Sequence, residues 1–167
     1  MKKFPLIVGA AMASLLVGCS TPVVLAPVGP GPFASRAVDS DTGSLQVYSR
    51  LVTRDEGSEN PVWRQHSHYY ISDANGLQKR YIDNTVGRYE REPRTVHLRP
   101  GTYMVRAIAS GGKWVELPVV IKRGETTVVH LDDRWNAESV PAKEIVSMPG
   151  GYPVGWRGNP APATGMD

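Results

Sequence analysis

The feature that most limits the fold of this chain is a series of short alternating runs between Gly43 and Asp132. Apolar residues recur at every second position, as in Tyr103, Val105 and Ala107, and turn residues interrupt each run. This period of two is typical of β-strands, because successive side chains of a strand point to opposite faces of a sheet. No part of this region keeps the 3.6-residue period of a helix. The sequence therefore predicts an all-β domain over residues 43–132.

Turn-forming residues divide this region into about seven strands. The Asn75-Gly76 pair suits a tight hairpin because glycine adopts positive φ freely, and Gly111-Gly112 and residues 123–125 provide two further turns. The early strands are expected at residues 45–53, 65–72 and 77–82. Strands of this number and spacing predict an antiparallel two-sheet sandwich.

The motif LRPGTYMV at residues 98–105, followed by the turn GET at 124–126, resembles carboxypeptidase-regulatory-like and PEGA-type modules. The resemblance covers about residues 94–131. It implies a prealbumin-like or immunoglobulin-like sandwich. At a sandwich corner Tyr103 would bury its ring and bond its hydroxyl to the backbone, and contact of Tyr103 with a ligand is the alternative. Such modules serve as accessory, surface or adhesive domains and carry no catalytic set of their own, so the resemblance implies a role outside catalysis.

The N-terminus has the layout of an export signal. Met1, Lys2 and Lys3 form a short positive region, and the next fifteen residues, 4–18, carry no charge. That stretch is shorter than the roughly 20 apolar residues that a membrane-spanning helix needs. We therefore expect residues 1–18 to be a signal peptide that is removed after export.

The sole cysteine of the chain, Cys19, follows Leu16, Val17 and Gly18 directly. This tetrapeptide resembles the lipobox of bacterial lipoproteins. The resemblance implies that Cys19 carries a diacylglycerol on sulfur, becomes the first mature residue and receives an N-acyl chain, with palmitate as a typical fatty acid. An ordinary signal peptide with a free cysteine is the alternative. Ser20 resembles a signal for transfer to the outer membrane; in a single-membrane organism the anchor would lie in the outer face of the plasma membrane.

Two regions rich in proline and glycine flank the expected β domain. Residues 19–42 are expected to form a flexible tether, which at about 3.1 Å per residue would reach up to roughly 60 to 70 Å. Residues 133–167 are expected to form an irregular tail. Because Trp135, Tyr152 and Trp156 are unusual in a disordered segment, we favour docking of the tail onto the domain over contact with a partner.

Charge and motifs argue against several functions. The net charge is +3, but removal of Lys2 and Lys3 leaves 17 basic against 16 acidic residues, which gives no support for nucleic-acid binding. A second cysteine for an internal disulfide is missing, and no G-x-S-x-G elbow or phosphate-binding glycine loop occurs. We therefore expect no enzyme activity and no cofactor beyond the covalent lipid on Cys19.

Two sets of residues are candidates for binding. His66 and His68 have the spacing of two metal ligands on one strand face, although exposed strand histidines explain the pattern as well. His97 and His130 lie on other expected strands. Aromatic and basic residues gather near the second and third strands and form a possible binding surface: Trp63, Tyr69, Tyr70, Tyr81 and Arg80.

Together these patterns predict a membrane-anchored envelope lipoprotein. Its partners are expected to be the lipid bilayer, through Cys19, and an envelope protein or glycan, through the β domain. The alternative is a small-ligand or metal-binding envelope module that uses His66 and His68.

Overall fold

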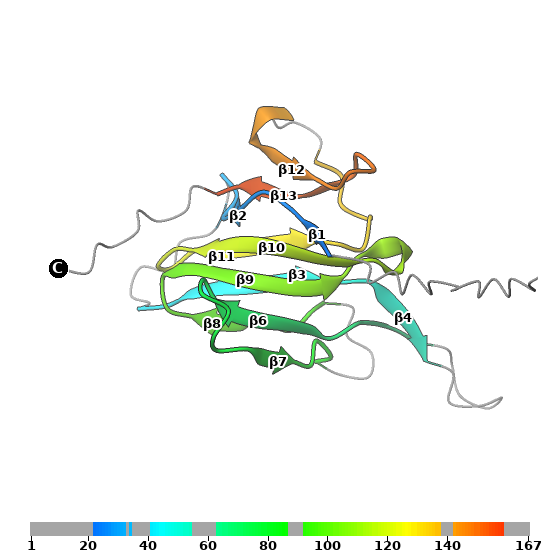
Figure 1. Ribbon diagram of the computed structural model, residues 1–167, viewed down its shortest axis with the longest axis horizontal. Helices are drawn as coiled ribbons and strands as arrows, with labels where there is room; N and C mark the ends of the chain where they lie inside the picture. Colours follow the sequence, from blue (N-terminus) through cyan, green and yellow to red (C-terminus); the bar gives the residue numbers. More distant parts are fainter. Residues whose placement is uncertain are drawn as a thin grey trace, which may run out of the picture.

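The computed structural model describes residues 22–32, 34, 41–54, 63–86, 92–137 and 142–158. Regular structure in these ranges consists of strands and two short 3-10 turns, so the all-β prediction is confirmed (Figure 1). The strands are β1 Val23–Val24, β2 Val28–Gly29, β3 Gly43–Tyr48, β4 Leu51–Arg54, β5 Trp63–His66, β6 Tyr69–Asp73, β7 Arg80–Ile82, β8 Val96–Leu98, β9 Gly101–Ile108, β10 Trp114–Ile121, β11 Thr126–His130, β12 Ile145–Ser147 and β13 Pro153–Arg157. The 3-10 turns are η1 Ser110–Gly112 and η2 Ala142–Glu144.

The strands form one large and two small sheets. The large sheet has the order β12-β13-β2-β10-β9-β6-β7, with β1 also paired to β10. A three-stranded sheet has the order β11-β3-β8, and β4 pairs with β5 alone. In Figure 1 the large sheet runs from β12 and β13 at the top to β7 at the bottom.

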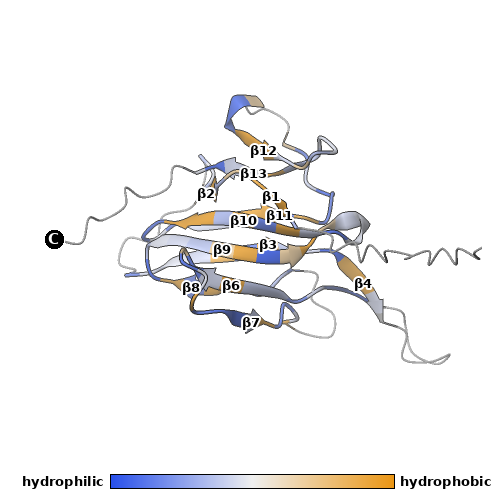
Figure 2. Cartoon of the chain, in the orientation of Figure 1, coloured by the Kyte–Doolittle hydropathy of each residue, from blue (hydrophilic) through white to orange (hydrophobic). Residues whose placement is uncertain are grey.

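A single core joins the large and the three-stranded sheets. Leu45 and Val129 of the small sheet and Tyr69, Val105 and Leu117 of the large sheet are fully buried and belong to one hydrophobic cluster. The alternation seen in the sequence produces this core, because every second residue is buried along β3 and β11, in the second half of β9 and in the first part of β10. Figure 2 shows hydrophobic residues on β9 and β10 in the middle of the large sheet.

The expected antiparallel pairing holds only in part. Strand β10 pairs antiparallel with β9 over its whole length, but β11 pairs parallel with β3, and both β1 and β2 pair parallel with β10. These parallel partners are far apart in sequence, and a long connection allows two strands to run in the same direction. The short connections, where a turn forces reversal, follow the prediction.

Two of the expected strands are broken in the middle. Residues 45–53 divide into β3 and β4 at Ser49 and Arg50, and residues 65–72 divide into β5 and β6 at Ser67 and His68. The backbone N–H of Arg50 donates to the carbonyl of Ile108, and that of Ser67 donates to the carbonyl of Arg50. At these breaks the chain passes from the three-stranded sheet through the paired strands β4 and β5 to the large sheet. The described residues of this region therefore form nine strands where about seven were expected.

A buried asparagine joins the segments that meet at these breaks. The Asn84 side-chain nitrogen donates to the carbonyl of Val47 at 2.7 Å and to the hydroxyl of Ser49 at 3.1 Å. Its side-chain oxygen accepts from the backbone N–H of Arg94 at 3.1 Å, and the Ser49 hydroxyl donates to the carbonyl of Ser67 at 2.5 Å. The side chains of Asn84 and Ser49 are therefore both hydrogen-bonded in this buried site, as burial requires.

The sheet extends beyond the expected limits of 43 and 132. Strands β1 and β2 come from the region expected to be a tether, and β12 and β13 come from the expected irregular tail. Val28 and Val154 are fully buried, and Val23 packs against the core, so apolar side chains hold these segments on the domain. The prolines do not prevent this, because Pro27 contributes only its carbonyl, which accepts from the N–H of Gly158.

Several local predictions are confirmed and one is wrong. Gly76 and Gly124 have positive φ of 75° and 70° in the expected turns. Tyr103 packs against the core and its hydroxyl donates to the carbonyl of Arg99 at 3.1 Å. The strand expected from residue 77 begins only at Arg80, because the N–H of Leu77 donates to the Asp73 side chain and so prolongs the turn.

Candidate functional site

A row of paired residues crosses five strands on the outer face of the large sheet. Register partners place these residues side by side from β1 to β7: Val24, Glu116, Arg106, Tyr70 and Tyr81. Their sequence neighbours on β10, β9 and β6 are buried in the core, so alternation directs this row away from it. Adjacent strands lie about 4.8 Å apart, which puts Tyr81 roughly 19 Å from Val24.

Four rings gather on this face, and we call His68, Tyr70, Tyr81 and Trp114 the aromatic face. The ring centroid of His68 lies 5.0 Å from that of Tyr81 and 6.3 Å from that of Trp114. The Tyr70 centroid lies 5.8 Å from that of Tyr81 and 6.2 Å from that of Trp114. Tyr81 keeps 58% of its surface exposed and the other three rings are partly exposed, so the edge of this face at Tyr81 remains accessible to a partner.

Basic side chains lie over two of these rings. The Lys79 ammonium nitrogen is 4.2 Å from the centroid of Tyr70, and the Arg106 guanidinium carbon is 5.3 Å from the centroid of Trp114. Arg106 also lies 3.7 Å from a carboxylate oxygen of Glu116. The aromatic face thus offers flat apolar rings beside hydrogen-bond donors, an arrangement that can stack on sugar rings or hold an aromatic or anionic group of a peptide.

The structure brings together only some of the residues that were named as a possible binding surface. Tyr70 and Tyr81 belong to it, but Tyr69 is fully buried because it points to the opposite side of β6. Arg80 lines a separate cavity, and the side chain of Trp63 lies outside the described part of the structure. Sequence reasoning missed Trp114, although its place one residue before an inward-facing valine was the signal that it points outward.

His66 and His68 do not form the expected pair on one strand face. His66 ends β5 and is buried, whereas His68 lies in the break before β6 and contacts the aromatic face. The Nδ1 of His66 donates to the carbonyl of Ser49 at 2.6 Å, and its ring meets Tyr48 edge-on. The i, i+2 rule fails here because the strand stops between the two residues. Among the described residues, no three metal-ligating side chains come together.

A second aromatic cluster covers the outer side of the three-stranded sheet. The rings of Tyr48 and His130 stack at 4.7 Å, those of His130 and Trp135 stack at 4.7 Å, and Trp156 meets Trp135 edge-on at 5.6 Å. Burial lowers the pKa of His130 to about 4, and the nearby His66 acts in the same direction. We call Tyr48, His130, Trp135 and Trp156 the aromatic stack. Through this stack, Trp135 and Trp156 of the expected tail dock on the domain, as the sequence predicted.

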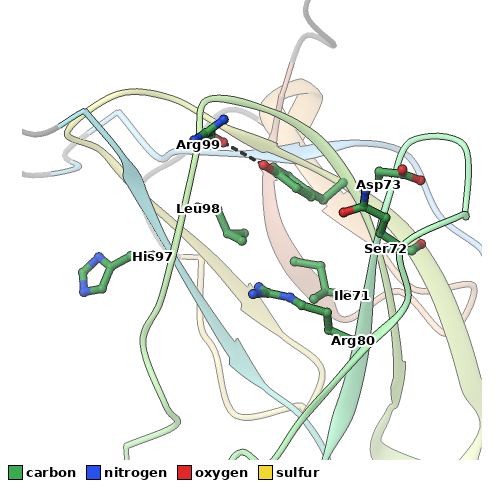
Figure 3. A pocket seen from close by; sticks show the side chains of 9 residues that line it. Ile71, Ser72, Asp73, Arg80, His97, Leu98 and Arg99 are labelled. Carbon is green, nitrogen blue, oxygen red and sulfur yellow. Dashed lines mark hydrogen bonds between the residues drawn. The ribbon is translucent and has the colours of Figure 1, made fainter.

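A cavity of about 350 Å³ opens near the start of β9, at the end of the sheets opposite to η1. Ile71 and Leu98 line its apolar side, and the Arg80 side chain extends toward them (Figure 3). His97, on β8, is also among the residues that line the cavity. Arg80 and Arg99 share this lining with Asp73 and several neutral polar residues, and this mixed set does not define a ligand class.

No family model, curated protein or solved structure matches this chain. Within the ranges that the structure describes, no helix has the length and hydrophobicity needed to span a bilayer. Leu16, Val17, Gly18, Cys19 and Ser20 lie outside the described residues.

Proposed function

We propose that this protein is a bacterial envelope lipoprotein anchored through Cys19. The support is the sequence alone: a charged start, an uncharged stretch of fifteen residues and a lipobox-like tetrapeptide that ends in the sole cysteine. Two or three fatty chains on this residue would hold the protein on the bilayer, whereas one chain binds only marginally. Ser20 favours the outer membrane, or the outer face of the plasma membrane if the organism has a single membrane.

The described domain is proposed to be a two-sheet sandwich of the prealbumin-like or immunoglobulin-like kind. The core that the large and three-stranded sheets share supports this, as does the hydrogen bond of Tyr103 to the backbone of Arg99. In modules that this chain resembles, the sandwich presents surfaces to a partner and does not catalyse a reaction.

The proposed role is binding of an envelope glycan or protein at the aromatic face. The observation that carries it is the exposure of Tyr81, 58% of its surface, in contact with His68 and Tyr70. Exposed rings that touch one another and lie under a lysine present a preformed surface on which a partner can stack. His66 and His68, directed into different clusters, give no support to the metal-binding alternative.

A photo-crosslinking experiment tests this role. A photoreactive phenylalanine analogue replaces Tyr81 in cells, and the control carries the analogue at Leu77, which is 81% exposed but outside the aromatic face. We expect a discrete crosslinked product from position 81 and none from position 77. In parallel, Tyr81→Ala should weaken co-sedimentation with purified cell-wall glycan by about 3- to 10-fold, the equivalent of one lost stacking contact. Equal crosslinking from positions 81 and 77, together with unchanged co-sedimentation of Tyr81→Ala, would refute a partner site at the aromatic face.

A further inference from the structure

The first described strand begins very close to the proposed lipid anchor. Val23 and Val24 pair with Val115 and Glu116, so β1 is an integral part of the large sheet. Three residues after Cys19 the chain reaches Pro22, the first described residue. A chain of that length spans at most about 10 to 11 Å. The expected reach of roughly 60 to 70 Å is therefore not available to the domain.

The direction of β1 decides which end of the domain lies near the anchor. Strand β1 runs parallel to β10, and its first residue pairs with the second residue of β10. The chain therefore enters the sheet beside Trp114 and η1. The cavity near the start of β9 lies at the opposite end, because β9 runs antiparallel to β10.

The corner at this entry point has the chemistry of a membrane interface. Val24 is 67% exposed on the outer face of the sheet. Trp114 lies on the same face, two residues before Glu116, which is the register partner of Val24. Lys113 is exposed next to Trp114, and the guanidinium of Arg50 reaches the backbone of Gly112. We call Val24, Arg50, Lys113 and Trp114 the anchor corner. Among the described residues, neither Arg50 nor Lys113 forms an ion pair.

One acidic group balances part of this charge. The Ser110 hydroxyl donates to the Asp133 carboxylate at 2.5 Å, which places that carboxylate at the same turn. Glu116, further along the face, is paired with Arg106. Arg50 and Lys113 therefore outnumber the Asp133 carboxylate that the hydrogen bond from Ser110 places at this turn.

We propose that the anchor corner rests on the bilayer, with Trp114 in the headgroup region and Lys113 and Arg50 against anionic lipid headgroups. This inference depends on the proposed lipidation of Cys19. The short connection keeps the domain at a high local concentration beside the bilayer. Weak contacts between the anchor corner and the lipid headgroups are then enough to orient the domain. Tryptophan is enriched at membrane–water interfaces, and basic groups are attracted to anionic leaflets. The Tyr81 edge of the aromatic face then remains accessible, and a partner must come to the membrane surface to meet it.

Fluorescence quenching in vesicles tests this orientation. Lipidated mature protein is reconstituted in phosphatidylglycerol-containing vesicles, and spin-labelled lipids with the label near the headgroup quench nearby tryptophans. Trp114→Phe should remove at least half of the quenching. Trp135→Phe should leave the quenching unchanged, because the ring of Trp135 stacks on His130 of the three-stranded sheet. Thermal melting confirms that both variants are folded.

Two further variants separate the contributions of charge and of tether length. Lys113→Glu should reduce quenching about twofold or more at low salt, and Lys122→Glu is its matched control because it lies just beyond the other end of β10. Ten Gly/Ser residues inserted between Thr21 and Pro22 should also reduce quenching while the protein still floats with the vesicles. Flotation with quenching that Trp114→Phe does not change would overturn this inference and leave the anchor intact. Failure of the protein to float would overturn the proposed anchor, and this inference with it.

Discussion

The ring of His130 lies parallel to that of Tyr48, its register partner on β3, with centroids 4.7 Å apart and planes inclined by 16°. Trp135 stacks on the other side of the same imidazole. A histidine between two aromatic rings loses hydration in its charged form, so burial lowers its pKa to about 4. The docking of the C-terminal segment is thereby linked to a titratable group.

This link predicts that acid destabilises the protein through His130. Its ordinary pKa is 6.5 and its folded pKa is about 4, so the unfolded state binds the extra proton between these values. Stability from this source is complete above pH 6.5 and is lost as pH falls toward 4. We expect a loss of about 1 to 2 kcal/mol, because the full shift must be reduced for a partly exposed ring. Urea unfolding at several pH values measures it.

His130→Phe is the variant that isolates this effect, since it keeps a stacked ring and removes the charge. Asp132 works in the opposite direction: burial raises its pKa, so its contribution improves as pH falls. Glu92 favours protonated His130 and His66 opposes it. Since these groups remain in the variant, the difference between the two proteins reports on His130. Parallel pH profiles for both would contradict the prediction.

A second prediction tests whether the flanking segments belong to the domain. A Cβ at Gly29 would lie 2.8 Å from the backbone Cα of Gly158, so β2 and the end of β13 would have to move apart. Gly29→Ala should lower the free energy of unfolding by about 1 to 3 kcal/mol, a typical effect of overpacking. Gly150→Ala, where a Cβ meets nothing within 4 Å, is the matched control and should change little. Equal stability of both variants would mean that these segments do not pair as described.

A third prediction concerns the buried hydrogen bonds at the strand breaks. Asn84→Ala removes one of the two donors to the Val47 carbonyl, which also accepts from the N–H of Ser49, and it removes the bonds to the Ser49 hydroxyl and the Arg94 N–H. Loss of these three hydrogen bonds from a buried side chain should cost about 2 to 3 kcal/mol in denaturant unfolding. Thr95→Ala, which removes one exposed hydrogen bond to Gln46, should cost much less. A similar loss in both variants would show that Asn84 does not hold the breaks together.

The sequence predicted the local structure well wherever neighbouring residues decide it. Glycines at 76 and 124 adopt the turns expected of them, and the alternation over β9 and β10 produces the predicted buried face. The breaks at Ser49 and Ser67 escaped prediction because distant backbone partners cause them. The same breaks made the inferred pairing of His66 with His68 wrong.

Proline content misled the prediction for the ends of the chain. Residues 22–29 were expected to be part of a tether. Val23, Leu25 and Val28 instead pack in or against the core of the domain, and this packing depends on strands that are distant in sequence. The candidate site likewise combines residues that the sequence pattern predicts with one residue whose place depends on distant strands. Tyr70 and Tyr81 were predicted, whereas the contribution of Trp114 depends on the register between β9 and β10.

We propose that a lipid on Cys19 places this β domain at the membrane surface. Mass spectrometry of the mature protein, purified from the membrane fraction of its own host, is the decisive measurement. We expect an N-terminal peptide that begins at Cys19 and carries the mass of a diacylglyceryl group, with or without a further acyl chain. A mature chain that begins at any other residue, or that begins at Cys19 with an unmodified thiol, would contradict it.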